Sequence, residues 1–121
     1  MLKLLLSVGL LCTSFSMDNQ NAKAIIGVWK AEAIENSSIE LYEAEDGLLY
    51  GKIVDSSEKD WIGKVIFSEG TYDAEANHWQ GELYSLKRKM TIAATLSLES
   101  DKKLKVVGKK FFMTKTFYWE R

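Results

Sequence analysis

Short runs of strand-forming residues, separated by turns, fill the chain from Ile25 onward. The runs are rich in Val, Ile, Tyr, Phe, Trp and Thr, and turn residues recur about every 8 to 12 positions, which is the spacing of an all-β barrel or sandwich. Apart from a candidate helical turn at 71–77, no long stretch has the i, i+3, i+4 spacing of an amphipathic helix. The pattern predicts eight strands, at 25–34, 37–44, 48–55, 62–68, 78–86, 90–99, 103–110 and 111–120.

Apolar residues alternate with polar ones in these runs, which indicates one buried and one exposed face for each strand. The alternation is cleanest at 90–99, where every second residue from Ile92 to Leu98 is apolar and the residues between them are small or polar. Glu45-Asp46-Gly47 joins the second and third runs with a glycine where positive φ is easiest, and Ser100-Asp101-Lys102 makes a similar turn later. We therefore expect one antiparallel all-β domain.

The absence of proline favours a closed sheet over an open one. Proline is a residue that often protects a strand edge from pairing, and this chain has none. Because closure removes the edges altogether, we expect a single small meander barrel of about eight strands, with a β-sandwich as the alternative. The interior of such a barrel is either filled by side chains or just wide enough for one small ligand.

The first sixteen residues have the features of an export signal. Lys3 supplies a positive start, and an apolar run from Leu4 to Phe15 follows. That run is shorter than the roughly 20 residues that a membrane-spanning helix needs. Ser14 and Ser16 place small residues at positions −3 and −1 of a cut after Ser16.

This leader defines the expected domain organisation. We expect a signal peptide at 1–16, a linker at 17–24 and a single β-barrel domain at 25–121, in an exported protein that is periplasmic or secreted and whose mature chain has no transmembrane span. A lipid anchor on Cys12, the one cysteine of the chain, is the alternative route to the cell envelope.

The composition argues against most catalytic and metal chemistry. One cysteine and one histidine exclude a disulfide framework and the usual zinc sites. His78 has no partner nucleophile that sequence spacing identifies, and no glycine-rich phosphate loop is present. A formal net charge of −1 argues against a nucleic-acid-coating protein. We expect no enzyme activity, no metal, no cofactor and no nucleic-acid partner.

The inward-facing positions allow two classes of function. In the first, which we favour, the barrel is a binding module that holds a small apolar ligand. In the second, the barrel is filled, and its outer face binds a partner in the cell envelope. Core packing would use the same side chains in both cases. The candidate lining residues are Ile39, Leu41, Leu49, Ile53, Phe67, Leu96 and Leu98.

Two tryptophans and an arginine near the ends of the domain are candidates for structural closure. Gly27 and Trp29 lie in the first expected strand, and Trp119 and Arg121 lie at the end of the last. If the barrel closes, these strands are neighbours, and Trp29 would close one end with the Arg121 guanidinium on its indole face. Such a contact contributes roughly 0.5–2 kcal/mol. The alternative is two unrelated core tryptophans and a solvated arginine.

Charge is distributed unevenly along the chain. Residues 17–86 hold 5 bases and 14 acids, a net charge of −9, whereas residues 87–121 hold 10 bases and 3 acids, a net charge of +7. The late strands would then form a basic face for an anionic envelope partner, with Lys87, Arg88 and Lys89 as its strongest point. Alternatively, closure sets basic late strands beside acidic early ones, which gives cross-strand pairs of roughly 0.2–1 kcal/mol each.

Five segments follow one another in a recognisable order: Gly27-Val28-Trp29, Asp46 to Val54, Trp79-Gln80-Gly81, Leu104 to Gly108 and Trp119-Glu120-Arg121. From about Ile26 to Arg121 the chain resembles the secreted bacterial family catalogued as domain of unknown function 2147. The resemblance implies export and a compact β domain, without a reaction. The Gly-x-Trp opening and the terminal arginine are also similar to those of lipocalin-like barrels, which bind small apolar ligands.

Two loops depart from the pattern of that family. The segment from Asp55 to Lys64 is short and lacks the usual Asn-Pro-Asp-type segment. The segment from Tyr84 to Lys89 replaces the usual Tyr-Asp-Pro-x-x-Gly-Lys turn. A function housed in these two loops is therefore not transferred to this chain.

Overall fold

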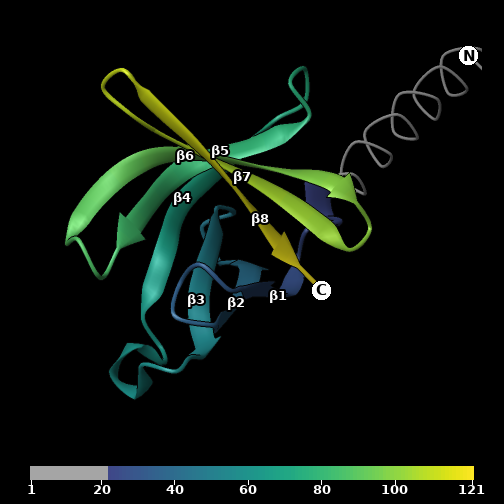
Figure 1. The fold of residues 1–121 in the computed structure, drawn as a ribbon. Helices are drawn as coiled ribbons and strands as arrows, with labels where there is room; N and C mark the ends of the chain where they lie inside the picture. Colours follow the sequence, from purple (N-terminus) through teal and green to yellow (C-terminus); the bar gives the residue numbers. More distant parts are fainter. Residues whose placement is uncertain (1–21) are drawn as a thin grey trace, which may run out of the picture.

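A computed structural model describes residues 22–121, which form a closed barrel of antiparallel strands arranged in chain order (Figure 1). Each strand pairs with the next, and the last strand pairs with the first at the Lys30–Glu120 position. The prediction of a small all-β meander barrel is confirmed. The strands are β1 (Gly27–Ala31), β2 (Ser37–Glu43), β3 (Leu49–Asp55), β4 (Val65–Asp73), β5 (His78–Ser85), β6 (Met90–Ser100), β7 (Lys103–Lys110) and β8 (Met113–Glu120), with a 3₁₀ helix, η1 (Lys59–Trp61), between β3 and β4.

Most of the expected N-terminal segments lie outside the described residues. These are the signal peptide at 1–16 with Cys12, and the linker as far as residue 21. Residues 22–25 form a short helical turn before β1. Ala22 and Ile25 of this turn are buried, so the described part of the expected linker already packs against the barrel.

Successive connections of a meander barrel lie at alternate ends. At one end are the connections 32–36, 56–64, 86–89 and 111–112, which we call the basic end. At the other, which we call the capped end, are the turn at 22–25, the remaining hairpin turns and the C-terminus. In Figure 1 the β5–β6 and β7–β8 turns lie on the left and the β4–β5 and β6–β7 turns on the right.

β4 differs most from its expected range of 62–68. It extends to Asp73, and the candidate helical turn at 71–77 is instead the end of β4 and a hairpin turn. Glu69 has a φ of 54°, and the β4–β5 register shifts between Ser68 and Thr71. This β-bulge breaks the period-two alternation from which strand faces are predicted.

The last strand also begins later than expected. The sequence predicted a strand at 111–120, directly after the one at 103–110, but β8 begins at Met113. Phe111 and Phe112 are the two residues of the β7–β8 turn. An antiparallel pair of consecutive strands needs such a connection. Within residues 22–121, no helix is long and apolar enough to cross a bilayer.

Candidate functional site

The seven candidate lining residues come together in the interior, where they form part of the hydrophobic core. Six of them have no exposed surface, and Leu98 is partly buried against the same core. The full set of buried apolar side chains in the described residues is Ala22, Ile25, Trp29, Ala31, Ile39, Leu41, Leu49, Ile53, Ile66, Phe67, Trp79, Leu83, Ala94, Leu96, Leu104, Val106 and Trp119.

Three glycines show how closely the interior is packed around Phe67. A methyl group added at Gly70 would lie 2.7 Å from Phe67 Cε2, and one added at Gly81 would lie 2.8 Å from Phe67 Cζ. A methyl group at Gly51 would lie 2.9 Å from Leu41 Cδ2. These distances are below van der Waals contact, so the missing side chains of the glycines make the room that the aromatic ring and its neighbours fill.

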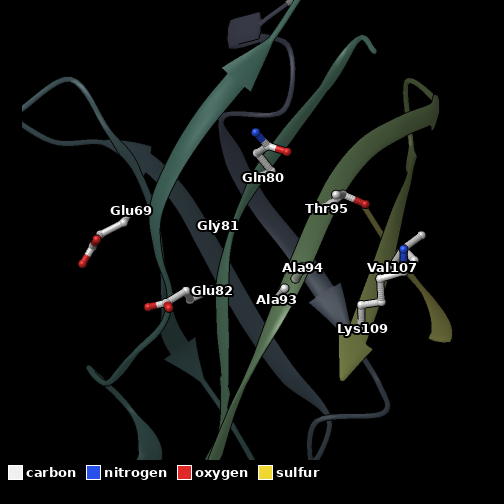
Figure 2. Close-up of a pocket in the computed structure, with 9 residues that line it drawn as sticks. All are labelled: Glu69, Gln80, Gly81, Glu82, Ala93, Ala94, Thr95, Val107 and Lys109. Atoms are coloured by element: carbon white, nitrogen blue, oxygen red, sulfur yellow. The ribbon is translucent and has the colours of Figure 1, made fainter. Parts of the chain in front are cut away.

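Two hollows on the described surface are lined by other residues than these seven. One, of about 490 Å³, lies on the outer face of β4 to β7 (Figure 2). Its charged lining residues are Glu69, Glu82 and Lys109. A second, of about 290 Å³, lies at the capped end, between the 22–25 turn, the β2–β3 turn and β4. Its lining includes Trp79 and Tyr72.

At the capped end, hydrogen bonds hold the 22–25 turn against the barrel. Three backbone carbonyls of this turn accept hydrogen bonds, one from a side chain of β1, one from a side chain of β5 and one from Arg121. Chain segments that are distant in sequence are thereby joined. The bonds run from Trp29 Nε1 to the Ile25 carbonyl (2.9 Å), from Trp79 Nε1 to the Ala22 carbonyl (2.8 Å) and from Arg121 Nη2 to the Ala24 carbonyl (3.1 Å).

The four residues singled out for closure lie at this same end. Arg121 Cζ is 4.1 Å from the centroid of the Trp29 ring, and Arg121 Nε donates to the Asp101 carbonyl (2.8 Å). Trp119 is buried in the core. Gly27 has a φ of +139°, and a methyl group added there would lie 3.5 Å from Arg121 Nη1. The positive φ is therefore what favours glycine at this position, since an added methyl group would only be in ordinary contact with the guanidinium.

The β2–β3 turn contains a pair of residues with shifted titration. Asp46 accepts hydrogen bonds from the Tyr50 hydroxyl (2.6 Å) and from the Leu48 backbone N–H (3.0 Å). These bonds favour the charged carboxylate, with that of Tyr50 the stronger influence, and hold the pKa of Asp46 below its usual value. The hydrogen bond to Asp46 raises the pKa of Tyr50 from 10.0 to about 12.

We expect Tyr50 to titrate later than an ordinary tyrosine. A titration followed by tyrosinate absorbance should contain a component near pH 12, which Tyr50→Phe removes and Asp46→Asn moves back toward 10. Because the pKa of Tyr50 is higher in the folded protein than in the unfolded chain, protonated Tyr50 stabilises the fold at pH values below its unfolded pKa. This stabilisation is lost as the pH rises through the pKa of the folded protein. For Asp46, whose pKa is lowered, the stabilisation is lost as the pH falls. A component removed by Tyr50→Phe that lies at or below pH 10 would contradict this assignment.

The basic triplet predicted from the sequence lies in the β5–β6 turn, at the basic end. Lys87, Arg88 and Lys89 are all exposed. Lys87 Nζ is 3.6 Å from Glu35 Oε1 in the β1–β2 connection. Of the three ion pairs between side chains of residues 22–121, this one joins a late base to an early acid, whereas the other two, Lys52–Glu40 and Lys105–Glu99, each lie within one half of the chain.

The β7–β8 hairpin carries most of the remaining positive charge. Residues 102–119 contain six lysines and no Asp or Glu. On β7, Lys103, Lys105 and Lys109 alternate with buried or closely packed positions and therefore face outward. Three lysine amino groups lie over aromatic rings: Lys103 over Tyr118 at 4.8 Å, Lys110 over Phe111 at 5.7 Å and Lys115 over Phe117 at 5.7 Å from the ring centroids.

The tip of this hairpin is the feature that sequence reasoning missed. Phe111 and Met113 expose 88% and 76% of their surface, and Phe112 is fully exposed. Apolar strand-forming residues at these positions were assigned to a strand. The signal that could have located them is the absence of any residue between two abutting predicted strands, since a hairpin needs at least a two-residue turn.

The geometry defines a small, closed antiparallel β-barrel with a packed interior, a capped end and a basic end. In the described part of the chain, no three His, Cys, Asp or Glu side chains gather in a way that could hold a metal ion. The chain belongs to the family described as uncharacterized protein conserved in bacteria (DUF2147), whose family model matches residues 27–121 and thus all eight strands. Comparisons with curated proteins and with solved structures find no match.

Proposed function

We propose that this protein is an exported bacterial barrel that binds an anionic partner of the cell envelope through its basic end. The observation that carries the proposal is the half of the β7–β8 hairpin nearest its tip, residues 106–117, which contains Lys109, Lys110 and Lys115 and no Asp or Glu. Lys109, Lys110 and Lys115, which flank the hairpin tip, form no ion pair with any residue of 22–121. The export signal expected at 1–16 supports a location in the envelope.

The packed interior favours this function over an apolar ligand inside the barrel. A small-molecule site needs a cavity of roughly 300 Å³ or more. The candidate lining residues are instead packed in the hydrophobic core, and the Phe67 ring occupies the space beside Gly70 and Gly81. An internal ligand would therefore have to displace core side chains.

Unpaired lysines bind an anionic surface without needing a cavity. Each Lys or Arg near an anionic membrane surface contributes roughly 1 kcal/mol. Exposed charges are screened beyond about 8 Å at physiological salt. Affinity is therefore expected to fall steeply with ionic strength, and this dependence should be weaker once lysines of the basic end are removed.

A charge-reversal experiment tests the proposal. The chain is taken from Met17, the expected mature N-terminus, because residues 22–121 contain the complete barrel and its cap. Lys109→Glu/Lys110→Glu should weaken binding to dextran sulfate and to phosphatidylglycerol vesicles by at least roughly 30-fold, since two contributions of about 1 kcal/mol are lost. Binding is measured by titration at several salt concentrations.

The matched control changes the same number of charges at the opposite end of the barrel. Lys23→Glu/Lys102→Glu alters two exposed lysines of the capped end and should leave both affinities within about threefold of the parent protein. Equal weakening by both double variants would mean that net charge alone matters, and would contradict a binding site at the basic end. So would affinities that do not change with salt.

A further inference from the structure

The β7–β8 turn places large apolar side chains in water at the outermost point of the basic end. Phe111, Phe112 and Met113 are consecutive, and each is at least three-quarters exposed. Isolated exposed apolar residues are common on soluble proteins, but contiguous ones mark interaction sites. The three side chains therefore need an apolar environment that the barrel does not provide.

The choice of residues in this turn opposes its backbone geometry. Two-residue hairpin turns favour glycine, or asparagine, at a position where φ is positive. Here Phe111 has a φ of 56°, which is unusual for a bulky side chain. The phenylalanine therefore opposes the local backbone conformation and does not contribute to the core. Such a residue is better explained by a contact with a binding partner than by a role in folding.

Lysines surround the apolar tip. Lys109 and Lys110 precede Phe111, and Lys115 follows Met113 by two residues. The amino group of Lys110 lies 5.7 Å from the Phe111 ring centroid, so a positive charge is adjacent to the exposed apolar side chains. Long lysine side chains can keep their amino groups in a polar layer while their aliphatic stems lie along apolar surface.

The hairpin projects beyond the rest of the barrel. The described register pairs β1 with β8 at Lys30–Glu120, whereas β7 pairs with β8 along its length, up to Lys110–Met113. The first half of β8 is exposed on both faces. In Figure 1 this hairpin forms the yellow loop that extends to the upper left, away from β1. The tip can therefore contact a surface while the rest of the barrel stays away from it.

We propose that the anionic partner is a lipid bilayer, and that Phe111, Phe112 and Met113 insert into its interface while the flanking lysines contact lipid phosphates. The inference rests on the proposed function, because the lysines supply the electrostatic part of binding. An interfacial segment typically buries its apolar face about 5–10 Å into the boundary between headgroups and acyl chains. Stable attachment usually needs two signals, here the apolar tip and the basic residues.

The combination of positive charge and exposed apolar side chains distinguishes a bilayer from two other candidate partners, a soluble glycan and a second copy of this chain. A soluble anionic glycan would contact the lysines but leave the phenylalanines in water. A second copy of this chain would cover the phenylalanines but bring the lysines of both copies together, which is unfavourable. An anionic bilayer satisfies both groups of side chains at once.

The test removes the apolar tip and improves the turn at the same time. In the chain from Met17, Phe111→Gly/Phe112→Asn places glycine at the turn position whose φ is positive, so loss of folding is not the expected result. Affinity for vesicles of phosphatidylglycerol and phosphatidylcholine should fall by about tenfold or more, because the apolar burial is lost. Affinity for dextran sulfate should stay within about twofold, because the lysines remain.

Exposed valines on the barrel wall provide the matched control. Val28→Thr/Val54→Thr removes apolar surface from two exposed strand positions and should leave vesicle binding unchanged. If the turn variant binds vesicles as tightly as the parent protein, the bilayer inference is wrong while the proposed function stands. If it loses dextran sulfate binding equally, the tip contacts the anionic partner directly and insertion is also wrong.

Two further results separate the remaining cases. If the parent protein binds neither probe, the proposed function itself fails. If sedimentation shows a dimer that the turn variant abolishes, while vesicle binding is unchanged, a second copy covers the tip and the inference is overturned.

Insertion can also be observed directly. The chain from Met17 lacks cysteine, because Cys12 is the only one in the sequence, so Phe112→Cys provides a unique attachment point for a polarity-sensitive dye. Its emission should shift to shorter wavelength on anionic vesicles and be quenched by a nitroxide carried on the lipid. The same dye on Lys102→Cys, at the capped end, should show neither change. Absence of both effects at position 112 would overturn the inference.

Discussion

Trp29→Ala is expected to lower the free energy of unfolding by about 3–5 kcal/mol, the usual effect of truncating a large buried aromatic residue. Trp29 has no exposed surface, and its indole N–H holds the carbonyl of Ile25. Its removal leaves a cavity, frees the 22–25 turn and takes away the ring beneath Arg121. Because small domains have total stabilities of roughly 5–15 kcal/mol, the denaturant midpoint should fall sharply.

Two comparison variants separate the contributions at the capped end. Trp29→Phe keeps most of the bulk but loses the hydrogen bond to Ile25, and should cost less than the alanine variant. Arg121→Ala removes the guanidinium from the indole face and should cost roughly 0.5–2 kcal/mol. All three are measured by urea unfolding followed by circular dichroism. A loss below about 1 kcal/mol for Trp29→Ala would show that this tryptophan does not hold the cap in place.

The strand pattern of the sequence was sufficient to predict an all-β fold, because each strand has one buried face and the alternation of apolar residues records it. The lack of proline then favoured the barrel over the sandwich. At β6, Ala94 and Leu96, which were expected to face inward, are the two fully buried positions of the strand. The prediction was wrong where the backbone departs from regular pairing. At β4, Ile66 and Phe67 are buried in succession and Glu69 forms a bulge, so a rule of period two cannot follow the strand.

The structures of the capped end and of the hairpin tip could not be predicted from the sequence, for different reasons. The segment 17–24 is mostly polar and predicts a linker, yet Ala22 is buried and its carbonyl accepts a hydrogen bond from Nε1 of Trp79, which is remote in sequence. Ile25, predicted to begin the first strand, instead lies in the helical turn, and its carbonyl accepts a hydrogen bond from Nε1 of Trp29. At the tip, phenylalanine is a strong strand former. Local propensity therefore predicts a strand where the topology requires a turn.

Whether the interior is open or filled could not be predicted from alternation at all. A barrel that holds a ligand and a barrel that is filled both need apolar inward-facing residues. The difference lies in the match between one large ring and the glycines beside it. Phe67 is adjacent to Gly70 and Gly81, and these residues come from two strands whose relative register includes a bulge.

Phe67→Ala is therefore expected to convert the filled barrel into one with an internal cavity. Loss of this fully buried ring should lower the free energy of unfolding by about 3–5 kcal/mol. A cavity lined by apolar side chains stays dry and can bind small apolar molecules such as benzene. The variant should thus bind benzene at one saturable site, measured by calorimetry or by the rise in melting temperature, and the parent protein should not.

Phe67→Leu provides the comparison if the alanine variant is too unstable to study. It removes less volume, so it should cost less stability and bind benzene more weakly or not at all. The contrast between parent and variant also bears on function. If the parent protein already binds an apolar probe saturably and Phe67→Ala does not strengthen that binding, the interior is open in solution, and an internal ligand rather than an anionic surface becomes the better proposal. If only the variant binds, the core side chains fill the barrel, and any partner must be recognised from outside.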